Sequence, residues 1–169
     1  MSIKSLLTQT LDDLEAVAKL FSTPVFDIYF LGGAACVLGG YTERATRDFD
    51  FVDLNYDSSL GRVFTVLRDY DMLEYESAVL ASDYRERAKK LDKYTAFNAY
   101  ILSPEDIAVS KIIRLSESDI QDIDALMDHC DKELINKIID NVLTRDDLFD
   151  SKKQGFKNNL QSFRERYDV

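Results

Sequence analysis

The sequence predicts a mixed α+β fold, with a sheet flanked by helices and a helical C-terminal part packed on it. Over residues 1–102, stretches with helical periodicity alternate with short apolar runs typical of strands. Beyond residue 102 the chain is almost entirely helical in pattern, without a repeat, low-complexity tract or Pro/Gly-rich linker. We therefore expect an α/β core over residues 1–102 and a helical part over residues 103–169, both in one globular unit.

The first element is an amphipathic helix that ends before Pro24. Its apolar stripe repeats every three or four residues: Leu7, Leu11, Leu14, Ala18 and Phe21. A buried strand follows over residues 26–31, and a short helix over 34–38 ends at a second diglycine, Gly39-Gly40.

The next segments continue the alternation of strand and helix. Residues 47–54 read as a strand, and Ser58 or Ser59 can cap a helix. The apolar face of that helix is Leu60, Val63, Phe64 and Leu67. Residues 76–81 and 95–102 have strand character.

Capping signals divide the C-terminal part into helices. Ser103 followed by Pro104 begins one that runs to residue 115, and Ser118 with Gln121 begins a second that ends near residue 127. Asp131 begins a third, with Leu134, Ile138 and Leu143 as its apolar face, and residues 155–167 form the last.

Composition limits the compartment and the kind of partner. No apolar run approaches the length of a membrane span. Acidic residues near the N-terminus stand where an export signal would need an apolar stretch. The two cysteines, Cys36 and Cys130, form no disulfide or zinc pattern, so we expect a cytoplasmic protein and no membrane partner. Cys36 is expected in the core, and the single histidine, His129, is assigned no catalysis.

The net charge of −10 disfavours a nucleic-acid surface. A nucleic-acid substrate would need a local basic patch, either residues 85–93 or residues 152–166, and both also read as solvated helix faces. A cationic small molecule or a protein partner fits this acidic balance better.

Two aspartates stand one residue apart in the strand over residues 47–54. Side chains alternate along a strand, so Asp48 and Asp50 share one face while Phe49 and Phe51 share the other. Carboxylates held together in this way repel each other unless a cation lies between them, and Mg²⁺ is often bound by one or two carboxylates plus substrate phosphates. A structural role, in which the aspartates cap turns or pair with Arg44 and Arg47, is the alternative.

A diglycine, Gly32-Gly33, stands at the junction of the preceding strand and helix. Glycine permits close approach to the backbone, and N–H groups at a helix start can bind phosphate. As a single signal, the diglycine would equally fit a tight turn.

Together these residues resemble the nucleotidyltransferase superfamily related to DNA polymerase β. Its signature is a Gly-Gly or Gly-Ser turn followed, about a dozen residues later, by Asp-x-Asp or Asp-x-Glu. Residues 44–50 (RATRDFD) look more specifically like the R-x-T-x-D-x-D form of a minimal bacterial branch that includes toxins of toxin–antitoxin and abortive-infection systems. Residues 102–126 resemble the K-x-x-R…D-x-x-D segment of that family, with its four positions at Lys111, Arg114, Asp119 and Asp122.

The resemblance implies a Mg²⁺- or Mn²⁺-dependent transfer of a nucleoside monophosphate from an NTP to an acceptor hydroxyl. Metal would bind to Asp48 and Asp50, and nucleotide to Gly32, Gly33, Thr46 and Lys111. Asp48, Asp50 and Lys111 would carry the catalysis. The acceptor stays open among a small molecule, a protein and tRNA, and a cognate protein partner is a further possibility.

Several assignments keep a structural alternative. Asp119 and Asp122 can pair with Lys111 and Arg114 simply to fix helix packing. Active members of the superfamily usually add a third carboxylate on a neighbouring strand, but residues 95–102 offer only Asn98, and Glu76 or Asp92 are the nearby acids. The alternative function is therefore a catalytically silent module of the same fold that binds nucleotide or a protein partner.

Overall fold

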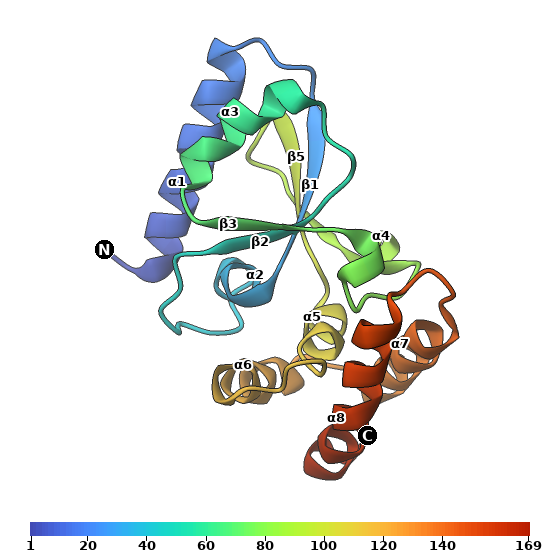
Figure 1. Cartoon of the computed structure of the whole chain (residues 1–169). Coiled ribbons are helices and arrows are strands. Elements are labelled where there is room, and N and C mark those ends of the chain that lie inside the picture. Colours follow the sequence, from blue (N-terminus) through green and yellow to red (C-terminus); the bar gives the residue numbers. More distant parts are fainter.

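The computed structural model describes all residues, 1–169, and has the predicted α+β architecture (Figure 1). The strands are β1 (Phe26–Leu31), β2 (Phe49–Val52), β3 (Tyr70–Leu73), β4 (Lys89–Leu91) and β5 (Phe97–Ile101). The α-helices are α1 (Ile3–Leu20), α2 (Gly32–Leu38), α3 (Gly61–Phe64), α4 (Tyr84–Arg87), α5 (Pro104–Ser110), α6 (Glu117–Met127), α7 (Lys132–Thr144) and α8 (Asp150–Tyr167). Three 3₁₀ turns complete the chain: η1 (Ser58–Leu60), η2 (Thr65–Leu67) and η3 (Tyr75–Ser77).

The five strands form one mixed sheet in the order β3-β2-β1-β5-β4. The central strand β1 pairs antiparallel with β2 and parallel with β5, while β2 pairs parallel with β3. This register places Asp50 opposite Leu31 on one side and opposite Asp71 on the other. Aspartates of two adjacent strands therefore lie next to each other on one face of the sheet.

Aromatic packing holds α1 and α3 on the face of the sheet opposite to these aspartates (Figure 1). The ring of Phe64 in α3 lies 5.6 Å from that of Phe26 and 5.1 Å from that of Phe51. Of the predicted stripe of α1, Leu7, Leu11, Leu14 and Ala18 are buried, whereas Phe21 is the C-cap residue and is exposed. Alternating apolar residues of the strands and the α1 stripe thus build one core of 32 residues.

The C-terminal helices enclose a second apolar cluster of 12 residues. Helix α5 contributes to both clusters, with Ile107 and Ala108 in the first and Val109 in the second. Arg87 of α4 also donates two hydrogen bonds of 2.8 Å to the buried carboxylate of Asp106 in α5. The helical part is thereby packed against the sheet rather than suspended from it.

One predicted strand is wrong. Residues 76–81 form η3 and an irregular segment, and the strand lies earlier, at β3. The irregular backbone is fixed by the buried guanidinium of Arg145, which donates to the carbonyl oxygens of Tyr75, Ala78 and Leu80 at 2.8–2.9 Å. Burial of Ala78 to Ala81 explains their apolar pattern without any sheet pairing.

Other differences are smaller. Helix α5 ends at Ser110, five residues before its predicted end, and α6 is capped by Ser116 rather than Ser118. The cap after β2 is Asp57, and the helix that follows is broken into η1, α3 and η2, although all four predicted apolar residues are buried. The basic stretch at 85–93 contains α4 and the edge strand β4 instead of one helix face.

The third predicted helix begins as expected, with Asp131 as the N-cap of α7. Of its predicted apolar face, Ile138 is buried, whereas Leu134 and Leu143 are half-buried. The fully buried positions are Ile135, Ile138, Ile139 and Val142. None of the helices is both long and apolar enough to pass through a lipid bilayer.

The role of Arg145 predicts a large loss of stability on truncation. Arg145→Ala would leave three backbone carbonyls without their donor, at about 1–3 kcal/mol for each unsatisfied buried group. We expect a fall of at least about 3 kcal/mol in the free energy of unfolding by urea denaturation. Arg166→Ala, which removes a half-exposed arginine, is the control and should change it by less than about 1 kcal/mol. Equal effects of the two substitutions would contradict this role for Arg145.

Candidate active site

The turn between β1 and α2 requires glycine at its first position. Gly32 has φ +72°, and a Cβ atom built on it would fall inside the carboxylate of Asp50. Any side chain here would therefore strain the backbone and displace Asp50. The first glycine of the predicted motif lets a carboxylate of β2 lie directly against the strand–helix turn.

The second glycine makes room for the loop that precedes β2. A Cβ atom on Gly33 would lie 2.9 Å from Nη2 of Arg44 and 3.1 Å from Oγ1 of Thr46. Gly33 has no left-handed backbone, so close packing is the reason for glycine at this position. Thr46 is thereby placed beside the turn, where the sequence resemblance puts it.

Three aspartates lie close together at one cavity: Asp50 on β2, Asp71 on β3, and Asp48 directly before β2. Phe49 and Phe51 point into the core, Asp48 is exposed, and Asp50 is half-buried. Asp71 lies beside Asp50 on β3 and is exposed. The sequence prediction that Asp48 and Asp50 face away from the phenylalanines matches this arrangement.

These carboxylates repel one another. Burial, followed by the neighbouring Asp71, raises the pKa of Asp50 to about 6, and Asp48 adds to the rise. Lys111 and Arg114 act in the opposite direction but do not cancel it. A site that holds carboxylates under mutual repulsion is chemically suited to a hard divalent cation.

The donor set fits a magnesium ion that is completed by its substrate. No three His, Cys, Asp or Glu side chains are already arranged around a common metal position. Mg²⁺ often takes only one or two carboxylates from the protein and fills its octahedron with water and phosphate oxygens. Asp48 and Asp50 can supply these two, with Asp71 next to them.

Lys111 is a buried cation between two buried carboxylates. It is the C-cap residue of α5, its side chain is 7% exposed, and its Nζ lies 3.0 Å from Asp122 and 3.6 Å from Asp119. Burial alone would raise the pKa of Asp122, but hydrogen bonds from Arg44 and Lys111 hold it below its ordinary value. Lys111 therefore fixes the packing of α6 on α5 and also faces the aspartates of the sheet.

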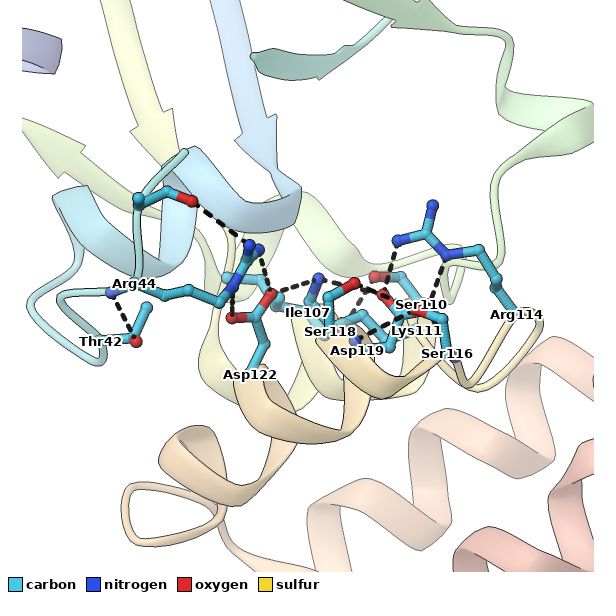
Figure 2. A network of polar contacts seen from close by, with 11 residues as sticks. Thr42, Arg44, Ile107, Ser110, Lys111, Arg114, Ser116, Ser118, Asp119 and Asp122 are labelled. Carbon is cyan, nitrogen blue, oxygen red and sulfur yellow. Dashed lines mark hydrogen bonds and ion pairs between the residues drawn. The ribbon is translucent and has the colours of Figure 1, made fainter. Parts of the chain in front are cut away.

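Arg44 joins the loop before β2 to the same cluster. Its guanidinium donates two hydrogen bonds to the carboxylate of Asp122, at 2.8 and 3.0 Å. Figure 2 shows its side chain reaching across from the loop toward α6. Neither Arg44 nor Arg47 forms an ion pair with Asp48 or Asp50, so the pairing considered as an alternative for those aspartates is absent.

Arg114 is an exposed cation at the site. Its guanidinium donates two hydrogen bonds of 2.7 and 2.8 Å to Asp119, yet 70% of its side chain is exposed (Figure 2). Asp119 in turn accepts from the backbone of Ser116 and closes the capping box of α6. Both predicted pairs of this segment exist, so its aspartates hold the helix packing and orient the cations.

A cavity of about 620 Å³ brings the two sequence motifs together. Its wall includes Gly33, Thr46, Asp48, Asp50, Asp71, Lys111 and Arg114. Gly32 lies behind Asp50 and supports it. Gly33 and Arg114, which are 81 positions apart along the chain, thus line a single space, with Asp50 and Asp71 on the sheet and Lys111 and Arg114 between α5 and α6.

The expected place of the third carboxylate was wrong. Asn98 pairs with Asp27 in the sheet register and donates a hydrogen bond of 2.8 Å to its carboxylate, at the opposite end of β1 from the diglycine. Glu76 lies in η3, and neither it nor Asp92 lines the cavity. Asp71 lines the cavity instead. It was missed because no strand was predicted at residues 70–73 and the third carboxylate was sought on residues 95–102.

The fold and this site together define a nucleotidyltransferase-like protein. A family profile described as "Nucleotidyltransferase of unknown function (DUF6036)" matches residues 9–168, and the chain belongs to that family. The expected relationship to nucleotidyltransferases is confirmed, whereas the toxin–antitoxin branch stays a prediction. Searches of curated proteins and of solved structures gave no significant match.

The ion pairs of Asp119 predict a pH-dependent contribution to stability. Burial would raise the pKa of this carboxyl, but hydrogen bonds from Arg114 and Ser116 outweigh it and lower the pKa from 3.8 to about 2. The folded state thus binds the proton less readily than the unfolded state. The stabilisation is present above pH 4 and is lost as the pH falls toward 2.

We expect Asp119→Asn to cost about 2 kcal/mol or more at pH 7, and this difference should shrink between pH 4 and pH 2. Urea denaturation of both proteins across this range measures it. Asp124→Asn, on the exposed side of the same helix, should cost less than about 1 kcal/mol at every pH. A penalty that does not change with pH would show that Asp119 acts through shape alone.

Proposed function

We propose that this protein transfers a nucleoside monophosphate from an NTP to an acceptor hydroxyl, with Mg²⁺ as cofactor. The observation that carries the proposal is the meeting, in one cavity, of a glycine turn, aspartates from two adjacent strands, and Lys111 with Arg114. Membership of a nucleotidyltransferase family supports the reaction class.

Each side of the cavity has a distinct role in this proposal. Asp48 and Asp50 hold the metal ion, which neutralises phosphate charge when bound. The triphosphate lies toward Gly33, Thr46 and the cations of the helices. Arg114 can direct the exposed part of its guanidinium to the phosphates while its two hydrogen bonds to Asp119 stay in place. Lys111 contributes a fixed positive charge.

The reaction itself requires few covalent roles from the protein. The acceptor oxygen attacks the α-phosphorus, the bond from that phosphorus to the bridging oxygen of the β-phosphate breaks, and pyrophosphate leaves. The proton of the acceptor hydroxyl passes to a carboxylate, for which Asp71 is placed best because it lies beside Asp50 and is open to the cavity.

Titration calorimetry with each NTP, with and without Mg²⁺, tests the binding step. The wild type should bind NTP more tightly with Mg²⁺ than without it. Asp48→Asn combined with Asp50→Asn should remove this difference, because the metal loses both protein ligands. Asp140→Asn, an exposed aspartate of α7, is the control for a lost charge. A double variant that still couples Mg²⁺ to NTP would refute the metal assignment.

Asp71 predicts a separation between binding and turnover. Asp71→Asn should keep Mg²⁺–NTP binding within a few-fold but lower transfer by about 10²–10⁴-fold, the usual contribution of a positioned base. Asn98→Asp is the matched comparison: it adds an acid on β5, outside the cavity, and should not raise transfer. Radiolabelled-NTP assays on both variants measure this. A gain in transfer activity with Asn98→Asp would instead favour the strand at residues 95–102 as the place of the third carboxylate.

The alternative function is an outcome of the same experiments. A wild type that binds Mg²⁺–NTP but transfers to none of a broad panel of small-molecule, protein and tRNA acceptors would be a nucleotide-binding module. A cognate protein partner, as in a toxin–antitoxin pair, would then be sought by co-purification.

A further inference from the structure

A second cavity, of about 780 Å³, adjoins the proposed active site. It lies between the N-terminal half of α1, the turn η2 with its exit, and the start of β2. Ile3, Thr46 and Arg47 line both cavities. Thr46 and Arg47 directly precede Asp48, so the two cavities meet next to the aspartates.

The lining of this cavity is amphipathic. Six of its fourteen residues are hydrophobic, among them Leu6, which is 49% exposed although it is a large apolar residue. Its volume is within the range of about 300–1,000 Å³ that is usual for small-molecule sites. The apolar wall can cover a ring or a short aliphatic body.

Two arginines give the cavity its chemical preference. Arg47 and Arg68 both line it, both are exposed, and neither takes part in any of the ten ion pairs of the protein. Both guanidinium groups are therefore free to bind an anion in this cavity. Asp13 and Asp69 also line it but leave both arginines unpaired.

The backbone at Arg68 is held in a conformation that costs energy. Arg68 has φ +62° and ψ −99°, outside the regions that residues with a side chain favour. Strained residues of this kind are held by the surrounding structure and cluster at functional sites. Here it sets the direction in which the chain leaves η2 and enters β3 at the rim of the cavity.

We propose that this second cavity binds the acceptor, and that the acceptor is a small molecule that combines an apolar or aromatic body with a phosphate or carboxylate group. Arg47 and Arg68 bind the anion, and the apolar wall of α1 and η2 covers the body. The hydroxyl of the acceptor then projects past Thr46 toward the aspartates. This assignment rests on the proposed function for its role, but its binding test needs neither NTP nor Mg²⁺.

The test uses three probes that differ only in the group attached to a ring: phenyl phosphate, benzoate and benzyl alcohol. Calorimetry on the whole chain, without nucleotide or metal, should show binding of at least one of the two anions at least tenfold tighter than benzyl alcohol. The tighter anion identifies phosphate or carboxylate as the recognised group. No binding of either anion, or equal binding of the neutral probe, would overturn the proposal.

Variants locate the binding. Arg47→Ala and Arg68→Gly, the latter chosen because glycine accepts positive φ without strain, should each weaken binding of the anion by about tenfold or more. Leu6→Trp should also weaken it by filling the cavity without any change of charge. Arg62→Ala removes an exposed arginine that lies over Phe21, outside the cavity, and should leave affinity unchanged. Insensitivity to both arginine variants would overturn the assignment.

The relation to the active site is tested separately. The Asp48→Asn, Asp50→Asn double variant should retain anion binding, so a failure of the metal assignment leaves this result intact. NTP with Mg²⁺ should bind together with the tighter anion. Competitive displacement would instead assign the cavity to the donor nucleotide and refute its role as the acceptor site.

Discussion

The buried ammonium group of Lys111 is the constraint on which both halves of the site depend. A cation with only 7% exposure is tolerable only if carboxylates compensate for its lost hydration, and Asp119 and Asp122 do so. Each of these acids also binds a second cation, Arg114 or Arg44. One buried charge therefore determines where α6 lies on α5, where the loop before β2 is held, and how Arg114 meets the cavity (Figure 2).

This network also separates charge across the site. Three cations stand against two carboxylates on the helical side, whereas Asp48, Asp50 and Asp71 repel one another on the sheet. Such a division would be unfavourable for an empty cavity but suits a ligand that carries both signs. A divalent cation bound to a triphosphate, as proposed above, would have this character: the metal would meet the aspartates and the phosphates would meet the cations.

The sequence predicted what depends on local pattern and missed what depends on tertiary pairing. The stripe of α1, strand β1, the diglycine turn and the common face of Asp48 and Asp50 follow from periodicity and could be foreseen. Residues 76–81 could not be recognised as irregular, because their apolar side chains are buried as those of a strand would be. The backbone of this segment is held by hydrogen bonds from Arg145, which is 65 to 70 positions away. A third carboxylate was sought on residues 95–102, which form β5 beside β1, so Asp71 on β3 beside Asp50 was overlooked. Asp71 had one usable signal, a short run, Tyr70–Leu73, with an acid placed as Asp50 is in β2.

The loop between α2 and β2 now has a physical explanation for its length. A short connection would lead directly from Gly40 to Asp48, but this chain must first place Arg44 against Asp122 and then return along Gly33. Once Arg44 is held, the following residues have little freedom. Thr46 packs beside the diglycine, and Arg47 comes to line both cavities. The ion pair between Arg44 and Asp122 thus also positions Arg47, which lines the second cavity. The packing of the C-terminal helices therefore affects the second cavity, although these helices do not line it.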